Sequence, residues 1–127
     1  MIKLLAIDDD PIIRTLIKKT FSNLGFEVLT ASDGFEGIHA TITQKPALIL
    51  LDIMMPIVDG LEVLKRIKEV PEVSKIPIIM FTAVAESKMV IESSKLGADD
   101  YIIKPFQSSI LITKVRDLLQ KVSLENL

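Results

Sequence analysis

Hydrophobic residues occur along this chain in two alternating patterns, short continuous runs and helical stripes. The runs are too short for helices and do not alternate with polar residues, which is typical of strands buried on both faces. They are Leu4–Ile7, Val28–Ala31, Ala47–Leu51, Ile76–Phe81 and Tyr101–Ile103. We therefore predict five buried strands.

Between the runs, apolar residues recur at the spacing of one helix face. The clearest stripes are Ile13, Leu16, Ile17, Phe21 and Leu24; Leu61, Leu64 and Ile67; and Leu111, Val115, Leu118, Leu119 and Val122. Segments 34–44 and 86–97 have weaker stripes and are also predicted to be helices, whereas residues 123–127 are expected to fray. This alternation implies an α/β fold, a parallel sheet with helices on both faces.

Turn and cap residues support these boundaries. Asp10 before Pro11 is typical of a helix N-cap followed by proline at the first helical position. Gly25 and Gly97 follow helical segments where a left-handed C-cap is expected, and Asp59 is interpreted as a turn or cap residue. Without repeats or a linker, residues 1–127 are predicted to form one domain with a core of about 3–122.

Composition narrows the functional classes. The chain has 127 residues, of which 49% are hydrophobic and 25% charged, so it is long and apolar enough to build a core. Its net charge of -2 and scattered basic residues do not favour direct nucleic-acid or membrane binding. It lacks cysteine, a signal-peptide pattern and an apolar run of about 20 residues, so we expect a soluble cytoplasmic domain.

Polar residues follow four of the predicted strands. Asp8 and Asp9 follow the first strand, Asp52 the third, Thr82 the fourth and Lys104 the fifth. Ligands of open parallel sheets bind at the carboxyl ends of the strands, where the strand order reverses. We therefore expect these side chains to form one site.

Converging carboxylates need a cation or a proton. Two of them about 4 Å apart repel by about 4 kcal/mol at an effective dielectric constant of about 20. Oxygen ligands without His or Cys suit Mg²⁺, and Lys104 would balance the remaining charge. Asp8 and Asp9 are equally compatible with a purely structural role. For Asp52, which follows the apolar run Leu48–Leu51, a functional role is favoured because burial of an ionisable group is costly.

Four fragments in this order make the chain resemble response-regulator receiver domains, particularly the single-domain chemotaxis regulators. They are Ile7–Pro11, Asp52–Pro56 with Asp59–Gly60, Thr82–Ala83 and Lys104–Phe106. The resemblance covers roughly Lys3 to Val122. It implies a flavodoxin-like (βα)5 three-layer sandwich with the strand order 2-1-3-4-5.

The resemblance implies roles for the acidic residues. Asp52 matches the phosphoacceptor of a two-component phosphorelay, which receives its phosphoryl group from a phosphohistidine on a histidine kinase or histidine phosphotransfer protein. Asp8 and Asp9 match the acidic pair that binds Mg²⁺ together with Asp52. Met54 would add its backbone carbonyl as a ligand.

The resemblance also implies phosphoryl contacts and a switch. Thr82, Lys104 and the amide of Ala83 would contact the phosphoryl oxygens, and the Lys104–Pro105 bond would be cis. Tyr101 matches a switch position that changes with Thr82, although a core tyrosine is an equally good interpretation. The output would pass through the face of the last two helices and the strand between them. Its candidate docking residues are Lys88, Ile91, Lys95, Ile103 and Lys114, which are also compatible with a solvated face.

Three functions are compatible with these residues. The favoured one is a phosphorylation-controlled binding module, which catalyses only its own phosphorylation and dephosphorylation and acts on a downstream protein. The second is a Mg²⁺-dependent phosphohydrolase, but Met54 occupies the position where such enzymes carry a general acid. The third is a receiver cut from a longer regulator with an output domain.

Other residues point away from different enzymes. The single histidine, His39, is expected on a solvated helix face, which disfavours a catalytic triad, and no Gly-rich phosphate loop is present. The methionines at positions 54, 55, 80 and 89 are interpreted as packing residues. Apolar Met54 and Val84 would flank the attacking water and so lengthen the phosphorylated lifetime.

Overall fold

A computed structural model describes residues 1–83 and 87–125 of the chain. Strands and helices alternate throughout these residues. Their bounds are β1 (Lys3–Ile7), α1 (Pro11–Ser22), β2 (Glu27–Ala31), α2 (Gly34–Gln44), β3 (Leu48–Asp52), α3 (Gly60–Lys68), β4 (Ile78–Thr82), α4 (Ser87–Lys95), β5 (Asp100–Ile103) and α5 (Ser108–Glu125). Every predicted strand and helix is confirmed, with boundary shifts of a few residues.

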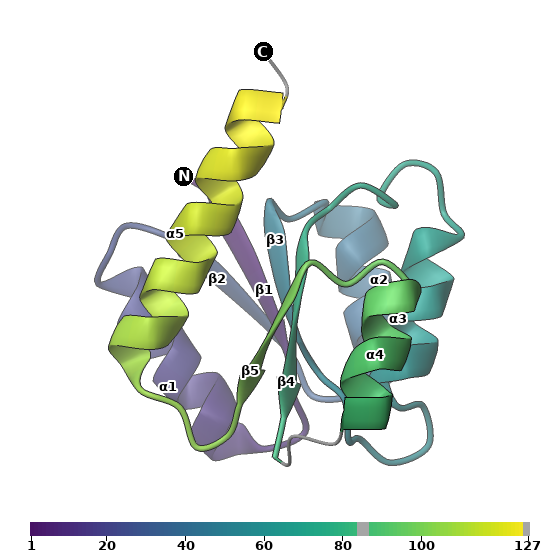
Figure 1. The fold of residues 1–127 in the computed structure, drawn as a ribbon. Helices are drawn as coiled ribbons and strands as arrows, with labels where there is room; N and C mark the ends of the chain where they lie inside the picture. Colours follow the sequence, from purple (N-terminus) through teal and green to yellow (C-terminus); the bar gives the residue numbers. More distant parts are fainter. Residues whose placement is uncertain (84–86, 126–127) are drawn as a thin grey trace.

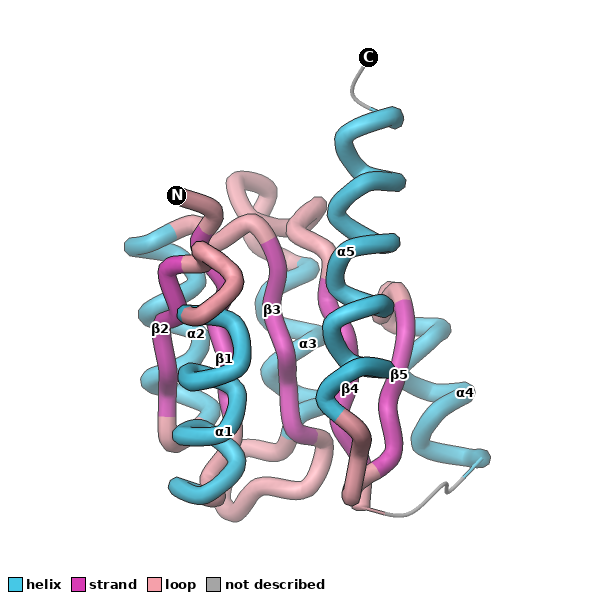
Figure 2. Tube along the Cα trace, turned by 90° about the vertical axis from the view of Figure 1, so that its left-hand side faces the viewer, coloured by secondary structure: helices cyan, strands magenta, loops and turns pink. Residues whose placement is uncertain are grey.

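The described strands form one parallel sheet in the order β2-β1-β3-β4-β5. Helices α1 and α5 cover one face, and α2, α3 and α4 cover the other (Figure 1). This arrangement confirms the flavodoxin-like three-layer fold. Because all strands are parallel, their carboxyl ends and the loops that follow them lie along the same edge of the sheet (Figure 2).

The two faces of the sheet have separate apolar cores. Side chains that include Phe21, Phe81 and Val115 pack under α1 and α5. Ile7, Val63 and others pack under α2, α3 and α4. All residues of the central strands β3 and β4 are buried, as their unbroken apolar runs predict.

The predicted caps are present. Asp10 and Asp59 accept hydrogen bonds through Oδ1 from the amides of Ile12 and Glu62, each at 2.9 Å, at the starts of α1 and α3. Gly25 has φ +90° in the turn after α1. The hydrogen bonds to Asp10 and Asp59 satisfy amides that have no partner inside their own helix.

Gly97 has φ +105° just after α4, as predicted. One other detail is corrected. Helix α1 ends at Ser22, so Leu24 lies beyond it, and both Leu16 and Leu24 are 39% exposed, whereas Ile17 and Phe21 of the same predicted stripe are buried. Helix α5 continues to Glu125, three residues beyond the predicted limit of the core at 122, and the fraying expected at this end stays a prediction, of which residues 126 and 127 lie outside the described residues.

Among the described residues, no helix combines the length and apolar character needed to cross a membrane.

Candidate functional site

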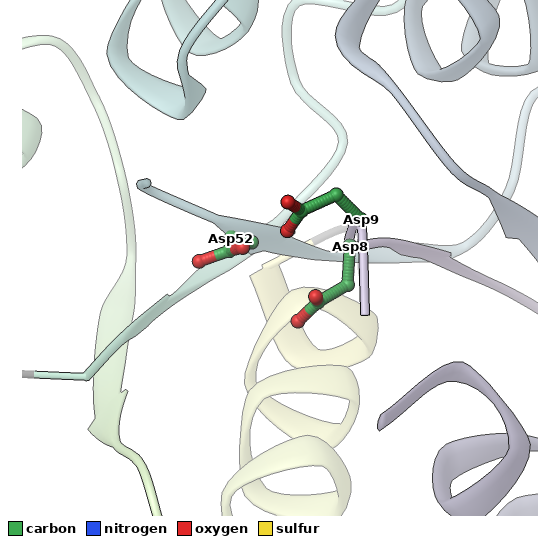
Figure 3. Close-up of side chains that lie close together, drawn as sticks. All are labelled: Asp8, Asp9 and Asp52. Atoms are coloured by element: carbon green, nitrogen blue, oxygen red, sulfur yellow. The ribbon is translucent and has the colours of Figure 1, made fainter. Parts of the chain in front are cut away.

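The sheet register places Asp8 beside Asp52. Ile7 of β1 pairs with Leu51 of β3, so the residues that follow them, Asp8 and Asp52, lie at the same level of the sheet. Asp8 is fully buried and Asp52 is 3% exposed, whereas Asp9 is exposed. One carboxylate oxygen from each residue lies within 4.8 Å of the others (Figure 3). The predicted convergence of these three residues is therefore confirmed.

Lys104 brings a positive charge into this cluster. Its Nζ donates a hydrogen bond to Oδ2 of Asp8 at 2.7 Å and lies 3.5 Å from Oδ1 of Asp52. The register of β4 and β5 pairs Thr82 with Ile103, and the amide of Lys104 donates to the carbonyl of Thr82 at 2.7 Å. The peptide bond between Lys104 and Pro105 is cis, as expected.

Arg14 is a residue of this site that the sequence analysis missed. Its Nη1 donates to the backbone carbonyl of Asp8 at 2.8 Å from the first half of α1. The amide of Asp10 donates to Oδ1 of Asp8 at 2.9 Å. Together with the bond from Lys104, these contacts fix both the backbone and the carboxylate of Asp8. Helical spacing alone could not reveal that Arg14 turns toward the sheet edge, because an arginine on α1 is equally compatible with a solvated face.

Burial and charge alter the protonation of Asp52. Burial is the main cause that raises its pKa from 3.8 to about 7, and the negative charge of Asp8 raises it further. Lys104 and the amide of Met54, which donates to Oδ1 of Asp52 at 3.3 Å, oppose this rise. Burial lowers the pKa of Lys104, but its contacts with Asp8 and Asp52 outweigh this effect and raise the pKa overall.

Gly60 lets the loop after β3 close tightly against the strand. Its amide donates to the carbonyl of Ile53 at 2.8 Å. A Cβ atom at this position would lie 2.1 Å from the carbonyl oxygen of Asp52 and 2.7 Å from Cα of Ile53. The absence of a side chain at Gly60 therefore permits the backbone position of Asp52.

The remaining predicted residues lie nearby in the fold. Thr82 is the last residue of β4 and is 2% exposed, and Ala83 follows it in an exposed position. Tyr101 on β5 is 42% exposed, so its interpretation as a core tyrosine is wrong: its side chain points away from the apolar core. His39 is exposed on α2, as predicted. Val84 lies outside the described residues.

The methionine interpretation is confirmed for three positions and wrong for one. Met55 and Met80 are buried, and Met89 packs against the same core. Met54 is 58% exposed, because it lies in the loop at the sheet edge and its neighbour Met55 takes the inward position. No contact tests the predicted role of the Met54 carbonyl as a ligand.

The donor set fits a hard divalent cation. It consists of carboxylate oxygens, two of the three aspartates are buried, and the ammonium group of Lys104 faces them. Mg²⁺ prefers oxygen ligands and retains water, which the exposed side of Asp9 can accommodate. The cluster can therefore bind Mg²⁺ through Asp8, Asp9 and Asp52.

Comparisons with known proteins agree with this geometry. The sequence profile of the response regulator receiver domain matches residues 4–116. The chain is 39% identical over 119 residues to the alkaline phosphatase synthesis transcriptional regulatory protein PhoP of Bacillus subtilis, covering 94% of this chain and 49% of that protein. It is 37% identical over 121 residues to the DNA-binding dual master transcriptional regulator RpaA of Synechocystis, covering 95% and 50%. The chain thus spans about half the length of these curated relatives.

Solved structures share the same fold. A two-component response regulator from Clostridium difficile superposes with a TM-score of 0.90 at 30% identity, covering 96% of this chain and 98% of that one. The chemotaxis protein CheY4 of Vibrio cholerae gives a TM-score of 0.88 at 30% identity, covering 92% and 98%.

Proposed function

The chain belongs to the response-regulator receiver domains of two-component signalling, and on that basis we propose that Asp52 is its phosphoacceptor. In this proposal the phosphoryl group comes from a phosphohistidine on a histidine kinase or a histidine phosphotransfer protein. Asp8, Asp9 and Asp52, with the backbone carbonyl of Met54, would hold Mg²⁺ beside the transferring group. The observation that carries the proposal is the buried Asp52 beside Asp8 and Lys104 at the carboxyl edge of the sheet.

The chemistry requires an ionised carboxylate and neutralisation of the phosphoryl charge. An oxygen of Asp52 attacks phosphorus while the bond from phosphorus to the histidine nitrogen breaks, and the nitrogen leaves with the bonding electrons. When bound, Mg²⁺ would supply positive charge to the transferring oxygens and favour the ionised form of Asp52. Lys104 contributes a second positive charge, and Thr82 and the amide of Ala83 donate hydrogen bonds to the phosphoryl oxygens.

Labelling by a small phosphodonor tests this function. With acetyl phosphate and Mg²⁺, the wild-type protein gains one phosphoryl mass, measured by intact mass spectrometry. Asp52→Asn, which is nearly isosteric but not nucleophilic, gains none. The matched control Asp59→Asn keeps labelling, because Asp59 caps α3 and is not a member of the acidic cluster. Unchanged labelling of Asp52→Asn would exclude this phosphoacceptor.

We further propose that phosphorylation changes the surface formed by α4, β5 and α5. The carbonyl oxygen of Thr82 accepts a hydrogen bond from the amide of Lys104, so a shift of Thr82 toward a phosphoryl group would be transmitted to the end of β5. Tyr101, Ile91 and Ile103 are 42%, 54% and 41% exposed on this surface and offer an apolar partner site. The partner is either a downstream protein or an output domain, as in the longer transcriptional regulators that the chain resembles.

We propose that the domain turns over no substrate other than its own phosphoaspartate. The phosphohydrolase alternative needs a general acid two residues after Asp52, but Met54 stands there and cannot transfer a proton. Sustained release of phosphate from a monoester over many turnovers would favour that enzyme instead. The cytoplasmic location and the extent of the domain remain predictions from the sequence.

A further inference from the structure

Arg14 connects helix α1 to the loop that carries Asp8 and Asp9. Its amide donates to the carbonyl of Asp10 at 3.1 Å, and its Nη1 donates to the carbonyl of Asp8 at 2.8 Å. The side chain therefore reaches back past the first turn of α1 to the end of β1. Helical side chains lean toward the N-terminus of their helix, so this direction requires no distortion of the backbone.

The guanidinium of Arg14 binds a neutral carbonyl rather than an acid. None of the ion pairs among the described residues includes Arg14. Fixing a long arginine side chain costs rotational entropy, and an arginine on a solvated helix face would retain that freedom. A hydrogen bond from a charged donor is shorter and stronger than a neutral one, so this contact can hold the backbone of Asp8 in position.

The other hydrogen bonds of Asp8 hold different atoms. Its amide donates to the carbonyl of Ala31 at 3.1 Å, Oδ1 accepts from the amide of Asp10 at 2.9 Å, and Oδ2 accepts from Nζ of Lys104 at 2.7 Å. Arg14 binds the carbonyl oxygen, which is the remaining polar atom of the residue. Because Asp8 is fully buried, loss of this bond would deprive a buried carbonyl of its charged partner and favour rotation of the peptide that follows.

The orientation of the Asp8 carbonyl also controls the position of Asp9. A peptide bond is planar, so the carbonyl of Asp8 and the amide of Asp9 belong to one rigid unit. The bond from Arg14 therefore fixes the point from which the Asp9 side chain starts. Asp9 is exposed, so packing against the core does not hold it. Its carboxylate nevertheless has an oxygen within 4.8 Å of an oxygen of Asp8 and of Asp52 (Figure 3).

The charge of Arg14 opposes the role that its hydrogen bond supports. A guanidinium bound to Asp8 lies beside a cluster that suits a divalent cation, and like charges repel. If Arg14 acted only through its charge, its removal would strengthen Mg²⁺ binding. If it acts by orienting the aspartates, its removal weakens Mg²⁺ binding. The two roles therefore predict effects of opposite sign.

We propose that Arg14 is a positioning residue of the Mg²⁺ site, which orients the Asp8–Asp9 peptide so that both carboxylates converge with that of Asp52. The inference deepens the proposed function and rests on it. Arg14 acts through the backbone of Asp8 and takes no part in the chemical step. Its hydrogen bond outweighs the repulsion of its charge, so the site binds Mg²⁺ more weakly without it.

Three variants of the full chain test the inference. Arg14→Met keeps an unbranched side chain that suits a helix but removes the charge and all donors. Arg14→Lys keeps the charge and a donor but not the planar guanidinium. Lys18→Met is the control, because Lys18 is an exposed residue of the same helix, so its loss removes a positive charge without removing the bond to Asp8.

The Kd of Mg²⁺ is measured by NMR titration of the amide signals without a phosphodonor. Arg14→Met should raise the Kd about tenfold, as is usual when a residue that orients a metal ligand is lost, and Arg14→Lys about threefold. Lys18→Met should leave the Kd within about twofold of the wild type, because the charge of an exposed residue is screened. In EDTA, the amide of Asp10, which is bonded to Asp8, should exchange its hydrogen faster in Arg14→Met than in the wild type.

Labelling by acetyl phosphate separates positioning from chemistry. Arg14→Met should be labelled slowly at a Mg²⁺ concentration near the Kd of the wild type, and at nearly the wild-type rate once Mg²⁺ is saturating. A rate that stays low at saturating Mg²⁺ would assign Arg14 to the chemical step and overturn the inference. If Arg14→Met does not fold, the Kd of Arg14→Lys decides, and a wild-type value would be the contrary result.

Two further results would overturn the inference and leave the proposed function intact. In one, Arg14→Met binds Mg²⁺ as tightly as the wild type or more tightly, so that Arg14 acts as a charge or not at all. In the other, Lys18→Met weakens binding as much as Arg14→Met does. Failure of the wild-type protein to bind Mg²⁺ or to be labelled would instead refute the proposed function, and this inference with it.

Discussion

Lys104 is bonded to Asp8 more closely than to Asp52: its Nζ lies 2.7 Å from Oδ2 of Asp8 and 3.5 Å from Oδ1 of Asp52. The ammonium group is thus anchored on the fully buried carboxylate and stands beside the proposed phosphoacceptor. In this position it offsets the repulsion between two aspartates and remains near enough to contact a phosphoryl group on Asp52.

Replacement of Lys104 by methionine should destabilise the protein in a pH-dependent way. Lys104→Met leaves two buried carboxylates without their cation, which costs about 3 kcal/mol of unfolding free energy at pH 8. Near pH 5 the loss should be smaller, because protonation of Asp52 relieves the repulsion. Urea unfolding at the two pH values measures this difference. Lys114→Met is the control: it breaks the more exposed pair with Asp100 and should cost less than about 1 kcal/mol.

Stability should fall as the pH rises through the titration range of Asp52. The folded state holds this proton more tightly than the unfolded chain, because the pKa is raised from 3.8 to about 7. The protein without Mg²⁺ therefore loses stability between about pH 4 and pH 7, by at most about 4 kcal/mol. Asp52→Asn should be stabilising at pH 8 and nearly neutral at pH 4.5 in thermal or urea unfolding. An equal effect at both pH values would contradict the raised pKa.

Removal of the exposed carboxylate of Asp9 should weaken Mg²⁺ binding more than it affects folding. Mg²⁺ at one hundred times its Kd should stabilise the wild type by about 2.7 kcal/mol, and Asp9→Asn should lose most of this gain. Asp10→Ala provides the comparison. It removes the N-cap of α1 and costs about 1 kcal/mol, but the Mg²⁺-dependent increment should persist. Melting curves with Mg²⁺ and with EDTA distinguish the two effects.

A methyl group at Gly60 should disturb both stability and the position of Asp52. The overlap with the Asp52 carbonyl and Ile53 involves backbone atoms, which cannot move aside as a side chain can. Gly60→Ala should therefore cost about 3 kcal/mol and slow labelling by acetyl phosphate. Gly25→Ala is the matched control: its Cβ would meet nothing within 4 Å, so the cost is limited to the strain of φ +90°. Normal labelling of Gly60→Ala would show that the loop can relax.

The lifetime of the phosphorylated form should depend on the apolar residues after Asp52 and Thr82. Met54→Asn and Val84→Glu introduce polar groups that can orient the attacking water, so each should accelerate dephosphorylation. Loss of the phosphoryl mass after donor removal measures the rate. Glu92→Gln, at an exposed position of α4, is the control. Unchanged decay in both test variants would count against this role of the apolar pair.

Much of this fold could be predicted from local pattern. The unbroken run Leu48–Leu51 indicates a strand buried on both faces, and β3 is buried throughout. Asp10 and Asp59 act within one turn of chain, so their cap roles could be predicted from neighbouring residues. Leu24 and Met54 were mispredicted because spacing and residue type do not reveal where a helix ends or which loop residue turns inward.

Parts of the site depended on contacts between distant elements. Arg14 and Ile57 gave no sequence signal, because an arginine on a helix and an isoleucine in a loop are both common. The bond from Arg14 to the carbonyl of Asp8 arises only when α1 packs on the sheet. Ile57 has φ +69° in a loop whose end is held by the hydrogen bond from the amide of Gly60 to the carbonyl of Ile53.

The sequence by itself determined the alternation of strands and helices, the caps and the identity of the polar residues at the strand ends, because these follow from periodicity and short-range hydrogen bonding. Only the tertiary structure decided that Lys104 binds Asp8 more closely than Asp52, that Tyr101 faces outward and that Ile57 is exposed in a strained turn. Those features depend on strand register and loop closure. Both bring together residues that are as far apart in the sequence as Asp8 and Lys104, and a local sequence pattern contains no information on such long-range contacts.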